Sequence, residues 1–337
     1  MGPVEIPEHI DGTRIRAVRA AEQPDAPLVV ECVDDEGHVR AGHLDTTGDR
    51  PRLTLVERDP TLPVPDDGAT LAHHLRHHVW LRVHGADQLV VPEREAPALR
   101  ARAVAAADAA RRAGFLAERW AEVAPGRLAV ERPAGQPCTD PGDPHWETLW
   151  PDWAERWARF CAQPADALPA HPAAAEVQCT RHAIDTAVAH GLLRLDEGTP
   201  RDTFRRVTDA FAEDAQGTAP AVGGLEPGQL LHDAATGTLA LTGLTGARAA
   251  EPALDLAELA VHAILAVARD HWSRDAGDAV LHAVMVAAGL LAVPPARLQL
   301  AQAVVALRLG GELALQPGGA RFAARWCETW LTKPVVG

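Results

Sequence analysis

The sequence predicts an α+β protein with a β-rich N-terminal half and a mainly helical C-terminal half. Between residues 13 and 57, short segments with alternating or apolar character follow one another, which is typical of strands. After a linker rich in proline, glycine and aspartate (133–144), long segments with helical periodicity dominate. The 337 residues are 47% hydrophobic, so the chain is long enough to form two lobes around a large core.

The N-terminal half is predicted to hold strands, a hairpin and two helices. Asp34–Gly37 is a plausible hairpin turn, and a loop follows at 58–68. A hairpin is expected around His84–Asp87. The expected strands are 13–19, 27–33, 38–44, 51–57, 79–83, 88–92 and 127–132, and the expected helices are 69–78 and 93–112.

The C-terminal half is predicted to be helical apart from two short strands near Leu230 and Leu239. Pro294–Pro295 and Gly310–Gly311 separate apolar helical segments. The last four helices are expected at about 253–270, 276–291, 295–310 and 318–330. We therefore expect a β-rich extension at 1–64, a smaller lobe at 65–135 and a helical lobe at 136–337.

Composition narrows the functional classes. The net charge of −14 disfavours nucleic acid and anionic membranes as partners, because both require a basic surface. The five cysteines are scattered and no signal peptide is recognisable, so a cytoplasmic location is expected. The longest uncharged run, 279–296, contains His282 and two prolines and predicts a buried helix rather than a membrane span.

One segment of about forty residues suggests a family. Residues 222–229 read V-G-G-L-E-P-G-Q, two short strands follow, and Glu251–Ala257 reads E-P-A-L-D-L-A before an apolar helix. This order resembles the catalytic segment of the aminoglycoside phosphotransferases, which are protein-kinase-like and carry H-G-D-x-x-x-x-N followed by a metal-binding aspartate. The resemblance covers about residues 80–330 and implies a bilobal protein-kinase-like fold.

The resemblance also implies that this member is degenerate, a pseudokinase. Gly224 stands at the catalytic aspartate, Gln229 at the magnesium-binding asparagine and Gly243, or Thr242 after a one-residue slip, at the metal-binding aspartate. Magnesium prefers charged oxygen ligands, so no metal and no cofactor is expected.

The lysine that pairs with nucleotide phosphates is also missing from its expected strand. Pro92 or Glu93 occupies its place, the only lysine in the chain is Lys333, and Arg94 offers a fork rather than a point charge. The resemblance therefore implies loss of ordinary ATP–magnesium phosphoryl transfer.

Several polar residues near the motif are candidates for a role. The resemblance implies that Asp255 braces the former catalytic loop through hydrogen bonds. Glu226, His232 and Asp233 are the ionisable groups nearest that loop, and they would be tested first for new chemistry. They are equally consistent with ordinary polar loop residues.

Two further groups could bind metal or act in catalysis. His73, His74, His77 and His78 fall on the expected helix 69–78, where i, i+4 spacing would suit two zinc ligands or proton transfer by His78. A solvated helix face explains the same pattern. Cys179 and His182 could pair as thiolate and base, or be a buried thiol beside an exposed imidazole.

Four tryptophans, Trp146, Trp150, Trp153 and Trp157, are spaced as a helical stripe. Pro151 suggests a helix start within the stripe rather than one uninterrupted helix. The indoles either pack in the core or line a groove for a peptide or partner protein, because tryptophan is frequent in interaction hot spots.

Three functions follow as hypotheses. The first is a peptide- or partner-binding subunit in bacterial peptide natural-product maturation of the lanthipeptide or thioamitide type, with a precursor peptide, a kinase and a lyase as partners. The second is a repurposed enzyme such as a thioether cyclase acting on a dehydrated precursor. The third is an unorthodox small-molecule phosphotransferase.

Overall fold

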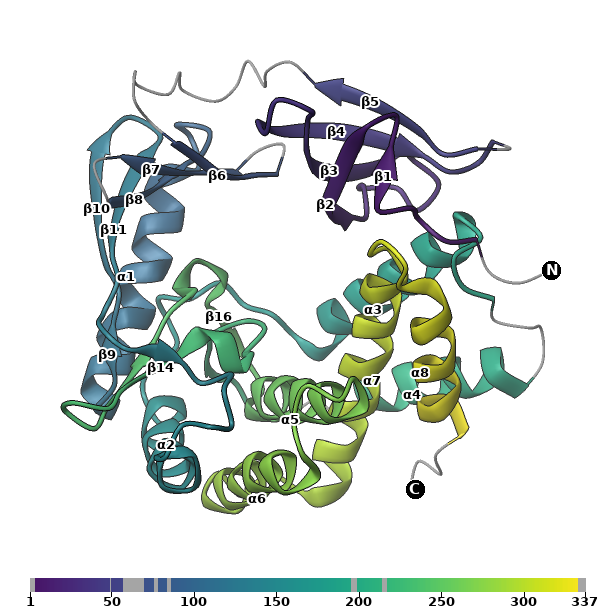
Figure 1. Ribbon diagram of the computed structural model, residues 1–337. Helices are drawn as coiled ribbons and strands as arrows, with labels where there is room; N and C mark the ends of the chain where they lie inside the picture. Colours follow the sequence, from purple (N-terminus) through teal and green to yellow (C-terminus); the bar gives the residue numbers. More distant parts are fainter. Residues whose placement is uncertain are drawn as a thin grey trace.

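The computed structural model describes residues 4–48, 50–56, 70–75, 78–83, 86–194, 199–213 and 217–332. It confirms the α+β prediction: two antiparallel five-stranded sheets occupy the first part of the chain and helices dominate the rest (Figure 1). The fold is bilobal, and the first sheet packs on the helical lobe.

The first sheet has the strand order β1-β2-β3-β4-β5. Its strands alternate between a core face, with Leu28, Val30 and Cys32, and a more exposed face, as the sequence pattern predicted. The predicted turn after β3 is present at Asp34–Gly37. The strands are β1 (His9–Ile10), β2 (Thr13–Arg19), β3 (Leu28–Val33), β4 (Val39–Asp45) and β5 (Arg52–Val56).

The second sheet has the order β10-β11-β8-β7-β6 and packs against helix α1 (Ala96–Ala113). Its strands are β6 (Thr70–Leu75), β7 (His78–Val83), β8 (Ala86–Val90), β10 (Arg119–Ala124) and β11 (Arg127–Glu131). Helix α1 ends at Gly114, whose φ of 97° favours glycine.

The predicted helix 69–78 is wrong. Residues 70–75 form strand β6, in which His73 pairs with Trp80 and His74 with Val79 of β7. Pairing with β7 outweighs the helical spacing of the histidines, because the β-branched and aromatic residues of β7 favour a strand that can form backbone hydrogen bonds with a neighbour.

The helical lobe begins after the linker at 133–144. Its helices are α2 (Trp146–Cys161), α3 (Ala173–Ala189), α4 (Thr199–Glu213), α5 (Pro252–Ala268), α6 (Arg274–Leu290), α7 (Pro295–Ala314) and α8 (Ala320–Thr332). Helix α2 is continuous through Pro151, contrary to the expected interruption. Pro151 lies within the first two turns, so the helix loses a single backbone hydrogen bond near its end.

A small hairpin lies between the two halves of the helical lobe. The predicted short strands are confirmed as β14 (Leu230–Asp233) and β15 (Thr238–Leu241), flanked by β12 (Gln136–Pro137) and β9 (Leu116–Ala117). A two-stranded pair, β13 (Ala219–Ala221) with β16 (Arg248–Ala250), lies at its base. The turns η1 (Pro227–Gln229) and η2 (Leu244–Gly246) precede and follow the hairpin.

The first sheet is fastened to the helical lobe by buried hydrogen bonds. His190, at the end of α3, bonds through Nδ1 with Thr46 Oγ1 at 2.6 Å and through Nε2 with the Ala26 carbonyl at 3.1 Å. Gln316, after α7, donates to the Val18 carbonyl at 3.0 Å. Figure 1 shows this sheet above α3, α7 and α8, beside the sheet of β6, β7, β8, β10 and β11. No helix in the described part of the chain has the length and apolar character needed to cross a bilayer.

Candidate functional site

The loop at Val222–Gly224 is held from below by a buried carboxylate. Asp255, near the start of α5, accepts the Val222 N–H at 2.5 Å through Oδ2 and the N–H groups of Gly223 and Gly224 at 3.3 and 3.4 Å through Oδ1. Burial raises the pKa of Asp255, and the charge of Arg248 and these donors oppose that rise. A Cβ on Gly223 would clash with the Gly246 carbonyl oxygen, so the loop packs closely on η2.

Gln229 and Gly243 meet at the neck of the β14–β15 hairpin. Thr242 donates from both its N–H and its Oγ1 to the Gln229 carbonyl, at 2.9 and 3.0 Å, which closes the hairpin. Gly243 has a φ of 75°, and a Cβ placed on it would lie 2.8 Å from Gln229 Nε2. The Gln229 amide therefore covers the α-carbon of Gly243.

A buried glutamate lies behind this neck. Glu118 accepts the Leu244 N–H at 3.4 Å and has 2% of its surface exposed. Burial raises its pKa, while hydrogen bonds from the backbone N–H groups of Gly243 and Leu244 act in the opposite direction. Glu118 thus braces η2 as Asp255 braces the preceding loop.

A cavity of about 630 Å³ opens beside the braced loop. Helices α3, α5 and α7, the loop 223–226 and strand β2 of the first sheet all contribute to its walls. The residues on the wall from β2 are consecutive, Ala17 to Ala20, and those from the loop are Gly223, Gly224 and Glu226. This cavity is hereafter called the loop cavity.

A network of charged groups, buried except for the partly exposed Glu312, forms the base of the loop cavity. Arg308 donates to Glu176 Oε1 at 2.8 Å, to Glu312 Oε1 at 2.7 Å and, in a short contact, to Glu258 Oε1. Glu176 also bonds with His171 Nε2 at 2.9 Å. The network brings one guanidinium group to three carboxylates, and Glu258 Oε2 is buried without a hydrogen-bond partner.

The environment drives two neighbouring groups of α5 toward their neutral forms. Burial raises the pKa of Glu258 to about 7, and the charge of Arg308 opposes the rise. Burial lowers the pKa of His262, one helical turn away, to about 4, and the charge of Arg308 adds to this effect. At neutral pH the loop cavity therefore presents a neutral imidazole and a readily protonated carboxyl group.

The network also contains a glutamate whose pKa is lowered, in contrast to that of Glu258. Burial acts to raise the pKa of Glu176, but the hydrogen bond from His171 and the charges of Arg308 and Arg248 outweigh it and lower the pKa to about 2. Glu176 is therefore the ionised partner of Arg308, and Glu258 is the carboxyl group that can carry a proton.

Glu226 is the predicted candidate that the structure places in the loop cavity. Its side chain reaches solvent, yet the surrounding protein removes enough water to raise its pKa. Asp233 instead caps the hairpin turn, where it accepts from Thr236 Oγ1 at 2.8 Å and from the Ala235 N–H at 3.0 Å.

The other predicted histidines lie apart from the cavity. His232 is buried on β14, with its Nδ1 3.5 Å from Asp143 Oδ2 and its ring 5.2 Å from that of His145. His78 lies on β7, with its Nε2 3.8 Å from a carboxylate oxygen of Glu95. The structure therefore does not bring Glu226, His232, Asp233 and His78 into one site.

The positions compared with the nucleotide lysine lie beyond the end of their strand. Strand β8 ends at Val90, and Pro92 to Glu95 form a turn before α1. The Arg94 side chain is 86% exposed and its Nε lies 3.8 Å from Glu95 Oε1. Arg94 is therefore a solvent-exposed side chain and does not place a positive charge inside the fold.

The four tryptophans of α2 are core residues, and the expectation of a peptide-binding stripe is corrected. Trp146 and Trp150 are 5% and 1% exposed, and Trp153 and Trp157 are 0% exposed. Trp153 and Trp157 stack with their centroids 5.7 Å apart. The indoles face α6 and the rest of the lobe, so no indole surface is available to a peptide.

The structure also does not support a metal-binding helix of histidines or a reactive cysteine–histidine pair. His73 and His74 lie on strand β6 and not on a helix, and His77 lies outside the described residues. Cys179 and His182 both line the loop cavity from α3, but His182 Nε2 bonds with the Ala21 carbonyl at 2.7 Å, and burial raises the pKa of Cys179. Cys179 is therefore not an activated thiolate.

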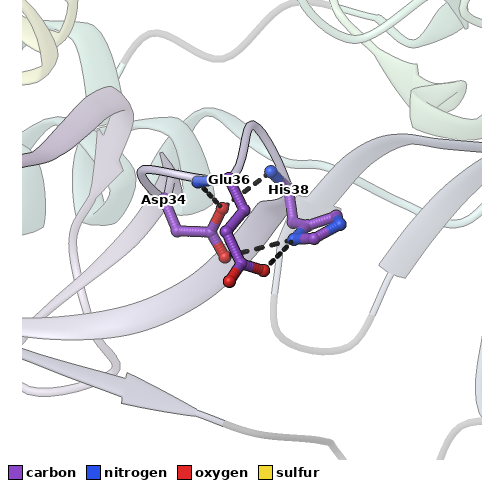
Figure 2. A group of neighbouring side chains, drawn as sticks. All are labelled: Asp34, Glu36 and His38. Carbon is purple, nitrogen blue, oxygen red and sulfur yellow. Dashed lines mark hydrogen bonds and ion pairs between the residues drawn. The ribbon is translucent and has the colours of Figure 1, made fainter.

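One group in the described residues has the spacing of metal ligands. Figure 2 shows Asp34, Glu36 and His38 at the turn between β3 and β4, with ligand atoms within 4.8 Å of one another. Asp34 already accepts the N–H groups of Glu36 and His38 and the Nε of Arg40. These bonds make a closed turn, and the Arg40 charge would repel a cation.

Sequence reasoning missed the charged base of the loop cavity. Glu258 and His262 are one turn apart in α5, whose other residues after Asp255 are apolar. Ionisable groups within an apolar helix are costly to bury, so this pattern is a signal for a partnered or functional pair. The partner Arg308 lies fifty positions away, and no local pattern identifies it.

Comparisons with known proteins identify the fold. No sequence family and no curated protein sequence matches the chain. Solved structures do match. A choline/ethanolamine kinase family protein from Mesorhizobium loti has a TM-score of 0.52 and 14% identity over 79% of this chain and 88% of that one.

Two further matches are aminoglycoside phosphotransferases. The GDP and kanamycin complex of APH(2'')-IIIa has a TM-score of 0.53 at 13% identity, and the match covers 79% of this chain and 91% of that one. A GDP complex of an aminoglycoside 2'-phosphotransferase has a TM-score of 0.52 at 14% identity, over 80% and 90% of the two chains. The arrangement of lobes, hairpin and helices is thus that of the protein-kinase-like fold of the aminoglycoside phosphotransferases, as the sequence predicted.

Proposed function

We propose that this chain is a kinase-fold protein that has lost magnesium-dependent phosphoryl transfer and binds a peptide in the loop cavity. The contact of Gln229 with Gly243 carries this proposal. In the family pattern these two positions supply the metal ligands, which must be oxygens pointing at one ion. Here Gln229 Nε2 lies 2.8 Å from the point where a side chain at position 243 would begin.

The remaining parts of the site support the same proposal. Gly224 has no group to accept a proton from a substrate hydroxyl, and its φ of 112° disfavours any other residue. Asp255 and Glu118 nevertheless hold the surrounding loops in place through buried hydrogen bonds. A loop that is still held in place beside an open cavity, but lacks the catalytic groups, suits a binding protein better than an enzyme.

The proposed setting is bacterial maturation of a peptide natural product of the lanthipeptide or thioamitide type. There the protein would bind the precursor peptide and associate with a kinase and a lyase that dehydrate serine or threonine. The proposal rests on the kinase-like fold and on a cavity large enough for several residues of an extended peptide.

Calorimetry with nucleotide and with peptide tests this function. We expect no heat of binding and no rise in melting temperature with ATP and Mg²⁺, because a ligand that binds the folded state must stabilise it. We expect binding of the precursor peptide encoded beside the gene, and co-purification with the neighbouring kinase and lyase. Saturable ATP–Mg²⁺ binding would instead support the phosphotransferase hypothesis, and a precursor that does not bind would overturn the proposal.

Thioether cyclisation is a second candidate, favoured by the groups at the base of the cavity. Addition of a cysteine thiol to a dehydrated residue requires a base for the thiol and an acid for the α-carbon. The neutral His262 can accept the thiol proton and protonated Glu258 can donate one, because burial lowers the pKa of His262 and raises that of Glu258. Glu226, whose pKa burial also raises, is a second carboxyl group at the cavity that can exchange a proton.

This candidate is tested by incubating the protein with a dehydrated precursor and measuring free thiol. Cyclisation predicts faster thiol loss than without protein, and a lower rate for Glu226→Gln and Glu258→Gln. Glu328→Gln, on the exposed face of α8, is the matched control and should keep the full rate. Equal rates with and without protein would remove the candidate and leave peptide binding intact.

A further inference from the structure

Within the described part of the chain, strand β2 has an edge that no other strand covers over its second half. In the described residues, β1 pairs only with Thr13 and Arg14, and the last backbone bond from that side is the Ile15 N–H to the Glu8 carbonyl. On its other side β2 pairs with β3 as far as Arg19. The stretch from Ala17 to Arg19 is therefore bonded to a neighbouring strand on one side only.

The open edge faces the loop cavity. Side chains of a strand alternate between its two faces, so a wall that contains four consecutive residues meets the strand along its edge. Ala17 to Ala20 form such a wall. Across from it lie Leu309 and Leu315 from the region of α7.

A side chain occupies one backbone position of this edge. Gln316 Nε2 donates to the Val18 carbonyl at 3.0 Å, so this carbonyl points away from β3. In an antiparallel ladder the N–H and C=O groups of one residue point to the same side, so the Val18 N–H also faces the cavity. Gln316 thus bonds where the N–H of an added strand would bond.

We propose that an extended peptide segment binds in the loop cavity by adding a strand to the edge of β2, and that it displaces the Gln316 side chain from the Val18 carbonyl. Main-chain hydrogen bonds then supply affinity that is independent of sequence, and alternate side chains supply specificity. This inference rests on the proposed peptide-binding function and specifies where and how the peptide binds.

The charges that line the cavity define the peptide segment further. The carboxylates of Glu226 and Glu312 offset the guanidinium groups of Arg19 and Arg308, and Arg308 is already bonded to Glu258 and Glu312. An acidic peptide side chain would therefore meet no excess of positive charge. We therefore expect a segment with uncharged or basic side chains.

Hydrogen exchange and binding assays on the full chain test the proposal. The probe is a fluorescein-labelled synthetic peptide of about ten residues, long enough to span the edge, composed of serine, threonine, valine and cysteine with one arginine. Binding should slow exchange of the Val18 amide by about tenfold or more, because that N–H gains a partner. N-methylation along the peptide should weaken binding at every second residue.

Peptide binding is also measured for the variant Gln316→Ala, with Gln163→Ala as the matched control. Gln163 lies at the exposed end of α2, away from the loop cavity. Removal of the competing amide should tighten peptide binding about three- to tenfold, the effect of about one hydrogen bond, while Gln163→Ala leaves it unchanged. Replacement of the peptide arginine by glutamate should weaken binding.

The outcomes separate this inference from the function on which it rests. If the peptide binds but the Val18 amide stays unprotected and N-methylation shows no alternation, strand addition is overturned and peptide binding stands. If neither this probe nor the encoded precursor binds, the proposed function itself fails.

Discussion

A buried carboxylate that accepts backbone N–H groups is hard to replace, even by its own amide. Asp255→Asn would keep the shape but offer one oxygen and an NH₂ group to the donors of Val222, Gly223 and Gly224. Hydrogen bonds to a charged acceptor contribute about 1.5–3 kcal/mol each, so we expect a loss of about 2–4 kcal/mol in the free energy of unfolding. Urea denaturation measures this loss.

The control for this variant is Asp278→Asn. Asp278 lies on the exposed face of α6, and its replacement should leave the unfolding midpoint unchanged. If the free energy of unfolding of Asp255→Asn equals that of the control within error, the loop at 222–224 does not depend on the carboxylate.

Glu258 should make stability depend on pH in a direction unusual for a carboxyl group. Its pKa is raised to about 7, so the folded state keeps a proton that the unfolded state releases near pH 4.5. The associated stability is fully present below about pH 4.5 and is lost as the pH rises to about 7. The full difference corresponds to roughly 3 kcal/mol.

Glu258→Gln removes this titration, and the variant should gain stability relative to the parent chain as the pH rises from 5 to 7. The comparison between the two chains is needed because His262 acts in the opposite direction. Its pKa is lowered to about 4, so its contribution to stability grows as the pH rises through that range. Melting temperatures measured over the pH series give the result, and parallel curves for the two chains would contradict it.

Three helices are joined by one guanidinium group at the base of the helical lobe. Arg297, in the first turn of α7, forms two bonds with Glu251 at 2.9 and 2.6 Å. It also donates to the Phe211 carbonyl at the end of α4 and lies 4.0 Å from the Phe211 ring centroid. Glu251 immediately precedes α5, so this pair fixes the starts of α5 and α7 against α4.

Arg297→Met should therefore destabilise the fold by about 3–5 kcal/mol, because the carboxylate of Glu251 would stay buried without its guanidinium partner. The double variant Arg297→Met with Glu251→Gln should recover part of the loss, since no charge would then be buried. A double-mutant cycle on the free energy of unfolding checks this. Additive losses in the two single variants would show that the pair is not coupled.

Local patterns were sufficient for some elements and insufficient for others. Strands β2 to β5 were predicted to within one or two residues, because each is a short apolar or alternating segment bounded by turn residues, although β5 has no fully buried residue. Strand β6 was predicted as a helix, since its partner β7, not its own sequence, determines its conformation.

In the candidate site, too, the sequence predicted some parts and not others. The motif frame predicted that Asp255 holds the loop at 222–224 through hydrogen bonds, and these bonds are present. The assignment of Gln229 and Gly243 to the metal-ligand positions stays a prediction. The loop cavity was not predicted, because its walls come from residues 17–20, 179–183, 258–262 and 308–316. The packing of α3, α5 and α7 on one another and the docking of the first sheet on these helices bring the segments together.

At the scale of the whole molecule, the first sheet shares one core with the helices. Ile6, Leu28 and Leu44 belong to the same buried cluster as residues of α3, α5 and α7. Leu89 and Leu128 of the second sheet also belong to it, and only a few residues of that sheet form a separate small cluster. The first sheet therefore stabilises the helical lobe and does not behave as an appended domain. We expect it to unfold together with that lobe.

His190→Ala tests this expectation at the contact between the two parts. The variant removes bonds to Thr46 and Ala26 and leaves a cavity, which should cost about 2–4 kcal/mol. Calorimetry should show one transition at a lower temperature, and His9→Ala, an exposed change on β1, should leave it unmoved. Thr46→Val removes one hydrogen bond only and should cost about 1 kcal/mol.

The shape of the calorimetric trace discriminates more sharply than its midpoint. If the first sheet were a separate unit, His190→Ala would split the trace into an early transition for the sheet and a later one for the helices at the parental temperature. A shared core instead requires both to shift together, because loosening of the sheet exposes α3 and α7 to water. The same coupling would link peptide binding at β2 to the stability of the helical lobe, so a bound peptide should raise the temperature of the single transition.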